Sequence, residues 1–313
     1  MTTALATITA TNIQPIISLV TNAVTSEHTR RAYGRALTEF LTWFQTSGAT
    51  GFNKATVAAH VAYLRDNGKP ASSINQRLTA IRKLGQEAAD NGLIDQSTAQ
   101  AISRVEGIHT DGKRLGNWLS KQDAQRLLDA PDVETIKGLR DKALLAVLLG
   151  CGLRREECAG LTVAHLQQRE GRWVVVDLVG KRNKTRSVPM PSWAKAAIDE
   201  WCKAVGITSA VQAELARPGF IFRPLRRGGH VQSGAMTAQA VFDVVCEYSG
   251  LLGLTVRPHD LRRTFAKLAY KGSAPIDQIQ LSLGHSSMQT TERYLGVSQD
   301  LTSAPCDVLG LKL

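Results

Sequence analysis

The first third of the chain consists of segments in which apolar residues recur at helical spacing. The segment 26–48 carries them at three- and four-residue intervals: Tyr33, Leu37, Phe40, Leu41 and Phe44. Ser26 is a predicted N-cap and Gly48 a predicted stop for this helix. Similar patterns follow at 54–67, 73–91 and 98–105. With short connections between them, these segments predict a four-helix bundle.

The pattern breaks at residues 108–117 (IHTDGKRLGN), which lose the apolar period and gather Asp, Gly, Lys and Arg. Such composition is typical of an exposed linker, so we expect one domain over residues 1–112 and a second over 113–313. In the second domain, SKQD at 120–123 predicts a capping box that opens an amphipathic helix. Residues 139–150 (LRDKALLAVLLG) are apolar on most sides, which predicts a central buried helix.

The apolar period then changes to that of strands. Residues 173–178 (WVVVDL) and 187–190 are β-like and flank GKRNKTR, which predicts a hairpin with a basic turn. A helix is predicted from Ser192 and further helices continue towards the end, with one short β-like stretch at 220–222. The predicted fold is mainly α with a small β-sheet: an N-terminal helical domain and a mixed α/β domain.

Composition narrows the class of protein. The chain has 313 residues, 43% of them hydrophobic and 21% charged, which is typical of a globular protein. Its 38 Lys and Arg exceed its 27 Asp and Glu, giving a net charge of +11. This excess favours a polyanionic partner, most often nucleic acid, although acidic small substrates remain open.

Two features predict a reduced, cytoplasmic setting. The five cysteines are odd in number and form no C-x-x-C pair, so we expect neither disulfides nor a zinc site. The N-terminus lacks a basic region, and the apolar patch 13–20 is interrupted by polar residues and Pro15. Neither a signal peptide nor a membrane span is expected.

Four motifs in the second domain carry the chemistry: GLRREE at 152–157, GKRNKTRSVP at 180–189, HDLRRTFA at 259–266 and LGHSSMQTTERY at 283–294. Taken singly, their polar residues could be surface ion pairs, solvated turn residues or a structural histidine. In this order and spacing, the set resembles the tyrosine recombinases, the phage integrase and Xer-type enzymes of site-specific DNA strand exchange. The opening TRRAYGRALTEFLTW at 29–43 is similar to the core-binding domain of that family, which would be the N-terminal domain here.

The resemblance implies a catalytic set for this chain: Arg154, Glu157, Lys181, His259, Arg262, His285 and Tyr294. It also implies an N-terminal DNA-binding domain and a C-terminal catalytic domain. Arg182 stands where many relatives carry Gly, so Lys184 stays open as a lesser candidate for the catalytic lysine.

Elementary chemistry agrees with these roles. A tyrosine hydroxyl has a pKa near ~10, so Tyr294 needs a base such as His259 or a cationic field to attack at neutral pH. Arg154 and Arg262 suit the non-bridging phosphate oxygens because guanidinium offers paired donors. Lys181 on its turn can protonate the leaving 5′-oxygen.

The two remaining members of the set have supporting roles. His285 can add a hydrogen bond to the same phosphate, and Glu157 is expected to orient Arg154 or a histidine.

The resemblance implies a 3′-phosphotyrosyl intermediate and a free 5′-hydroxyl, chemistry like that of type IB topoisomerases. Because the intermediate conserves bond energy, no cofactor is expected. The sequence has no GxxxxGK[ST] loop, no clustered carboxylates and no Cys/His ligand set, so we expect neither ATP nor metal and disfavour a two-metal nuclease.

The expected partner is double-stranded DNA, bound by a homo-tetramer on two sites, with an accessory DNA-bending or directionality protein possible. Phosphate contacts are weakly assigned to basic residues of both domains: Arg30, Arg31, Arg77, Arg82, Lys83, Arg223, Arg226 and Arg227. Integration or excision of a mobile element and resolution of DNA dimers use the same residues and stay open. A catalytically silent DNA-binding accessory protein or repressor is the alternative. Such a protein would be expected to have lost Tyr294 or one of the arginines, and this sequence retains them.

The 19 residues after Tyr294 contain several apolar members: Leu301, Val308, Leu309, Leu311 and Leu313. They are too many for a solvated end. The resemblance implies that this tail docks on a neighbouring protomer; packing on its own domain is the other interpretation.

Overall fold

The computed structural model describes residues 13–109, 117–180, 185–207 and 219–296. By its internal contacts the chain divides into two compact units, Met1–Lys113 and Arg114–Leu313. Two sequence predictions, on the lysines Lys181 and Lys184 and on the apolar tail, lie outside the described residues.

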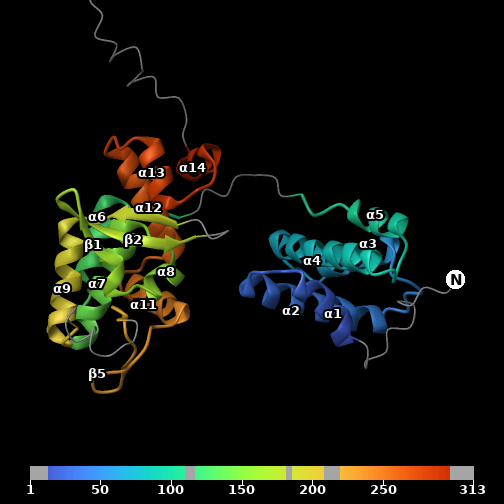
Figure 1. Ribbon diagram of the computed structural model, residues 1–313, viewed down its shortest axis with the longest axis horizontal. Helices are drawn as coiled ribbons and strands as arrows, with labels where there is room; N and C mark the ends of the chain where they lie inside the picture. Colours follow the sequence, from blue (N-terminus) through green and yellow to red (C-terminus); the bar gives the residue numbers. More distant parts are fainter. Residues whose placement is uncertain (1–12, 110–116, 181–184, 208–218, 297–313) are drawn as a thin grey trace, which may run out of the picture. The chain divides into compact units, whose positions relative to one another are not determined.

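Unit 1 contains the four predicted helices: α2 (Glu27–Thr46), α3 (Lys54–Asp66), α4 (Ala71–Asp90) and α5 (Gln96–Ser103) (Figure 1). As predicted, Ser26 caps α2, its hydroxyl accepting the N–H of Thr29. A further helix, α1 (Ile13–Asn22), precedes them and packs on α2 and α4. The sequence predicts no element for this segment, whose apolar patch Pro15 interrupts; proline is tolerated in a first turn, where its missing N–H has no helical partner.

An imidazole lies in the core of unit 1. His60 of α3 is fully buried, with its ring centroid 5.0 Å from that of Phe40 and 4.7 Å from that of Trp43. Neither ring nitrogen has a hydrogen-bond partner among the described residues. Burial therefore lowers the pKa of His60 to about 4.

Unit 2 is organised around the predicted buried helix, α7 (Ile136–Cys151), in which 11 of 16 residues are buried. The helix α6 (Lys121–Asp129) packs on it, and so does α9 (Ser192–Ala204). Ser120 caps α6, accepting the N–H of Asp123, while the Asp123 carboxylate accepts the Ser120 hydroxyl.

A three-stranded antiparallel sheet follows α7, in the order β1 (Leu166–Arg169), β2 (Arg172–Val179) and β3 (Thr185–Pro189). β2 and β3 form the predicted hairpin. β1 was not predicted because its sequence, LQQR, carries no apolar alternation; it is recruited by pairing with β2 across a tight turn. The β-like stretch 220–222 forms no strand, only a single bridge between Phe220 and Thr162.

The rest of the described part of unit 2 is mostly helical (Figure 1): α8 (Arg155–Ala159), α11 (Ala238–Leu251), α12 (Pro258–Lys271), α13 (Ile276–Leu283) and α14 (Met288–Leu295). A small hairpin of β4 (Leu225–Arg226) and β5 (His230–Val231) precedes α11. No helix in the described ranges is long and apolar enough to cross a membrane.

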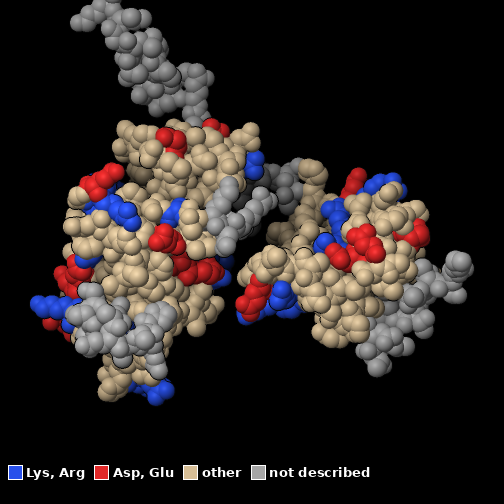
Figure 2. All heavy atoms as spheres, in the orientation of Figure 1, with Lys and Arg blue, Asp and Glu red and all other residues tan. Residues whose placement is uncertain are grey.

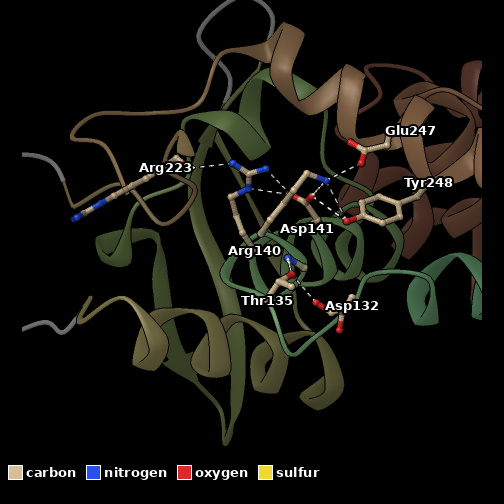
Figure 3. Close-up of polar contacts among 9 residues, drawn as sticks. Asp132, Thr135, Arg140, Asp141, Arg223, Glu247 and Tyr248 are labelled. Carbon is tan, nitrogen blue, oxygen red and sulfur yellow. Dashed lines mark hydrogen bonds and ion pairs between the residues drawn. The ribbon is translucent and has the colours of Figure 1, made fainter. Parts of the chain in front are cut away.

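A buried ion-pair network fixes α7 to α11 (Figure 3). The fully buried carboxylate of Asp141 accepts bonds from Arg140 (2.8 Å), Lys137 (2.9 Å) and the Tyr248 hydroxyl (3.1 Å). Lys137 also pairs with Glu247 at 2.8 Å. Because the carboxylate is compensated by two cations and a hydroxyl, it can be buried in the core without an unpaired charge.

Candidate active site

A left-handed glycine sets the start of the site. Gly152 ends α7 at φ +59°, and a Cβ there would lie 2.6 Å from the Phe265 ring. The turn allows Arg154 to become the N-cap of the short helix α8. There the Glu157 carboxylate accepts the backbone N–H of Arg154 at 2.8 Å and its guanidinium at 2.7 Å. Glu157 thus holds both the main chain and the side chain of Arg154.

Glu157 has a second cation on its other side. Arg186 of β3 donates to both carboxylate oxygens, at 2.8 and 2.7 Å, and the two side chains are only 9% and 8% exposed. Burial alone would raise the pKa of Glu157, but hydrogen bonds from Arg186 and from the backbone of Arg154 lower it to about 2. Glu157 is therefore ionised and is not a proton donor at neutral pH.

Arg262 is held by the main chain. Its guanidinium donates to the carbonyl oxygen of Gly152 at 2.6 Å and to that of Leu283, the last residue of α13. The residue is 2% exposed, and burial together with nearby Arg154 lowers its pKa to about 10, so it stays charged at neutral pH. A guanidinium has five N–H groups, which leaves donors for a ligand.

A hollow of about 240 Å³ opens beside these cations, lined by Arg154, Arg257, His259 and Arg262 among others. His259 lies one turn before Arg262 on α12. Burial, followed by the charges of Arg263 and Arg262, lowers the pKa of His259, which favours its neutral form. The hollow combines fixed cations with a neutral imidazole, a combination suited to a phosphate group and a proton transfer.

The LGH turn supplies the second imidazole. Gly284 ends α13 at φ +63°, and His285 follows it, its Nδ1 3.0 Å from the hydroxyl of Thr291. Burial and the charge of Arg262 lower the pKa of His285 to about 4. His285 is thus neutral and fixed in orientation by α14.

Tyr294 of α14 lies between the two histidines. Its ring meets those of His259 and His285 edge to face, with centroids 5.6 and 5.2 Å away. The guanidinium of Arg263 lies 4.9 Å from the ring centre. Burial raises the pKa of Tyr294, although Arg262 and Arg263 act to lower it.

The structure therefore brings six of the seven predicted catalytic residues into one cluster: Arg154, Glu157, His259, Arg262, His285 and Tyr294. Lys181, and its alternative Lys184, lie outside the described residues. The cluster includes two arginines that were given no role from the sequence, Arg186 and Arg263. The signal was present, because Arg186 belongs to the KTRSVP motif and Arg263 to the RR pair.

The basic residues weakly assigned to DNA in unit 1 all have intramolecular partners. Arg30 donates to the carbonyl oxygens of Thr21 and Val24 near the end of α1, and Arg82 donates to that of Val105. The others form ion pairs: Arg31 with Glu27, Arg77 with Glu39 and Lys83 with Glu87. A phosphate contact by these side chains would have to compete with these bonds.

In unit 2, Arg223 donates to the carbonyl oxygen of Phe220, whereas Arg226 and Arg227 are exposed at the β4–β5 hairpin. Figure 2 shows Lys and Arg interspersed with Asp and Glu on the visible face of each unit, so the net positive charge forms no single patch there. Assignment of DNA contacts to these eight residues stays a prediction.

Comparison with known proteins identifies the class. Residues 117–300 match the model of the phage integrase family, and residues 17–92 match the N-terminal SAM-like domain of phage integrases. The chain therefore belongs to the phage integrase family, the tyrosine recombinases, enzymes that cleave and rejoin DNA through a phosphotyrosine intermediate.

Curated relatives cover both units. Tyrosine recombinase XerD of Pseudomonas aeruginosa is 29% identical over 280 residues, 88% of each chain. Tyrosine recombinase XerC of Myxococcus xanthus is 31% identical over 246 residues, 78% of this chain and 77% of the relative.

Solved structures share the fold at lower identity. The XerH recombinase in its post-cleavage complex with difH DNA has a TM-score of 0.67 at 17% identity, covering 95% of this chain and 83% of its own. A lambda integrase dimer bound to a core site has a TM-score of 0.66 at 14% identity, covering 95% and 80%.

Proposed function

We propose that this protein is a site-specific recombinase that cleaves double-stranded DNA with Tyr294 as nucleophile. The observation that carries the proposal is one continuous cluster: Arg154, Arg262 and His259 line the hollow, and the Tyr294 ring meets the rings of His259 and His285 edge to face. Three chain segments supply these groups: the N-cap of α8, the helix α12 and the stretch from His285 to Tyr294.

In the proposed cleavage step, the Tyr294 oxygen attacks the scissile phosphorus and loses its proton, with His259 as the base. A bond forms between Tyr294 Oη and phosphorus while the bond from phosphorus to the 5′-oxygen breaks. The leaving 5′-oxygen takes a proton from Lys181, with Lys184 as the alternative donor. Arg154 and Arg262 bind the non-bridging oxygens, whose charge grows in the transition state.

The products are a 3′-phosphotyrosyl link and a free 5′-hydroxyl, so the reaction neither consumes nor requires a nucleotide or metal cofactor. Attack of a partner strand's 5′-hydroxyl on this link reverses the chemistry and completes an exchange. Among the described residues no group of three or more His, Cys, Asp or Glu is placed to hold a metal ion.

For the biological role, we favour resolution of DNA dimers over integration or excision of a mobile element, because the XerD and XerC relatives match 88% and 78% of this chain at 29% and 31% identity. The solved structures do not separate the two roles, since XerH and lambda integrase match at 17% and 14% identity. The proposed assembly is a homo-tetramer on two DNA sites. Within it, the apolar tail would dock on a neighbouring protomer.

The test does not require a known target sequence. Genomic DNA fragments are incubated with the protein, denatured in detergent, and captured through the protein; only covalent adducts survive. The parent should enrich a small set of fragments, and Tyr294→Phe should enrich none while its binding under native conditions persists. Equal capture by Tyr294→Phe, or no capture by the parent, would contradict the proposal.

The enriched fragments also separate the two roles. A single chromosomal locus indicates dimer resolution, whereas the ends of a mobile element indicate integration or excision. Lys181→Ala and Lys184→Ala, assayed on a nicked form of the enriched site, decide which lysine is the acid.

A further inference from the structure

Arg186 joins three segments of unit 2. It lies on β3, donates through both terminal nitrogens to Glu157 of α8, and donates through Nε to the carbonyl oxygen of Ser282 in α13 at 3.0 Å. Its Cδ lies so near Gly284 that a Cβ at position 284 would come within 2.7 Å. One side chain therefore contacts the partner of Arg154 and the turn that precedes His285.

The bond pattern uses features that lysine lacks. Two parallel N–H···O bonds fix both the distance and the plane of the Glu157 carboxylate, and the third donor points to a different segment. With Arg186 in this position, Glu157 Oε1 receives the guanidinium of Arg154 and Oε2 receives its backbone N–H. A rotation of the carboxylate would disturb both bonds at once.

We propose that Arg186 is a positioning residue for strand cleavage: it orients Glu157, and through it Arg154, and fixes the LGH turn that carries His285. This inference rests on the proposed function. Arg186 itself has no contact with the nucleophile among the contacts described, and its side chain is nearly buried, so it acts through Glu157 and the turn and not as a ligand of DNA.

Unit 2 offers a matched control in the network of Figure 3. Arg140 is also an almost buried arginine, its side chain 8% exposed, and it pairs with a buried carboxylate, that of Asp141. It also donates to the carbonyl oxygen of Arg223. None of these partners belongs to the catalytic cluster. Arg140→Lys therefore measures how much the fold alone loses when a buried arginine is replaced by lysine.

The first experiment compares Arg186→Lys with Arg140→Lys in the full chain, on a nicked suicide substrate with protein in excess. Arg186→Lys should slow single-turnover adduct formation ~10-fold or more while DNA affinity changes less than about threefold. Arg140→Lys should keep the cleavage rate within about threefold when corrected for the folded fraction. Parent-like cleavage by Arg186→Lys, or an equal loss in both variants, would overturn the positioning role.

The second experiment tests whether Arg186 acts through the charge of Glu157, using Arg186→Met, Glu157→Gln and the double variant. If it does, the double variant should be no slower than the slower single variant within about threefold, because the two changes break one connected unit. If the rate loss of the double variant equals the product of the two single losses, the two residues act separately, and this part of the inference is overturned.

The pH profile gives a readout that a purely structural role would not move. Glu157 faces Arg154, Arg186 and Arg262. Burial raises the pKa of Glu157 and these cations lower it, so loss of Arg186 should raise the pKa of Glu157. The ratio of Arg186→Met to parent rates should therefore fall as pH is lowered from about 8 to 5.5, and this fall should be smaller in the Glu157→Gln background. Arg186 is also one of the charges that lower the pKa of His285, so a fall of equal size in both backgrounds would assign it to His285 and would overturn the role of Glu157.

The outcomes separate this inference from the proposed function. If Tyr294→Phe still forms an adduct, the proposed function fails, and the positioning role, which rests on it, fails with it. If Tyr294→Phe is inactive and Arg186→Lys equals the parent, only the positioning role fails.

Discussion

The hydroxyl of Tyr294 donates to the backbone carbonyl oxygen of His259 at 3.3 Å, while the rings of the same two residues meet edge to face at 5.6 Å. In the proposed mechanism this oxygen attacks phosphorus, but here it gives its hydrogen bond to an acceptor that cannot take the proton. Attack requires the hydroxyl to leave this carbonyl and turn towards a base. DNA binding has to supply that rearrangement, since the free protein favours the neutral phenol.

The first prediction concerns the pH dependence of cleavage. Burial and neighbouring cations lower the pKa of His259 below its usual 6.5, so its neutral form prevails down to that pH, whereas the pKa of Tyr294 is raised. The apparent second-order rate of adduct formation, which reports the free protein, should stay level between pH 7 and 6.5 and fall only at lower pH. It should stay level up to pH 9, because the raised pKa of Tyr294 leaves on its hydroxyl the proton that His259 takes. A midpoint above pH 7 on the acid side would contradict this assignment.

The second prediction concerns Arg154 and Arg262, for which lysine would keep the charge but not the paired hydrogen-bond donors. Arg154→Lys and Arg262→Lys keep a cation but lose paired donors, so single-turnover cleavage should drop by ~10²-fold or more. Arg126→Lys is the matched control, because Arg126 lies on α6, forms a partly exposed pair with Asp123 and does not line the hollow. Arg126→Lys should stay within about threefold of the parent; a Lys variant at position 154 or 262 that does the same would show that the arginine only binds.

The third prediction concerns the guanidinium over the nucleophile. Arg263→Gln removes a cation 4.9 Å from the Tyr294 ring centre, so the pKa of Tyr294 should rise and cleavage at pH 7 should slow by roughly 3- to 10-fold. The deficit should shrink at high pH. Lys267→Gln, on the same helix and over the Trp118 ring, is the control and should not change the pH profile. A deficit that is constant with pH would mean that Arg263 acts on something other than ionisation.

The fourth prediction concerns the stability of unit 1. His60 has a folded-state pKa of about 4 against 6.5 when unfolded, so between these values the unfolded state binds more protons. The contribution of neutral, buried His60 to the free energy of unfolding should therefore be complete above pH 6.5. As the pH drops to 4, protonation of this residue in the unfolded state should lower the free energy of unfolding by about 3 kcal/mol.

The charged groups that act on His60 are Glu39, which raises its pKa, and Arg77, which lowers it. His60→Leu should flatten the fall in the free energy of unfolding between pH 6.5 and 4, measured in the full chain by hydrogen exchange of the backbone amides of α2 and α3. If the loss of unfolding free energy between pH 6.5 and 4 is the same in His60→Leu, protonation of carboxylates causes it and His60 does not.

The sequence predicted the helices of both units well because their signals are local: periodicity, caps and stops. It missed β1 because LQQR has no pattern of its own and is a strand only through pairing with Arg172–Val175, and it missed α1 because Pro15 obscured a helical start. The sequence of a segment does not by itself specify which other segments it will pair with or pack against.

The catalytic cluster was predictable as a set of residues but not as a geometry. Motif order identified Arg154, His259 and Tyr294. The clamp of Arg186 on Glu157 and the stacking of Arg263 on Tyr294 depend on β3 and α12 meeting residues distant in sequence, which spacing alone does not reveal.

The two carbonyl oxygens that hold Arg262 belong to main chain at the ends of α7 and α13. No neighbouring side chain has to be kept for these bonds to form, provided that both turns keep their shape. Surface residues of this protein should therefore tolerate extensive sequence drift, or deliberate retargeting to new DNA sites, without moving the Arg262 guanidinium, the proposed ligand of the scissile phosphate. The turn glycines Gly152 and Gly284 should be the positions at which such libraries lose their active members.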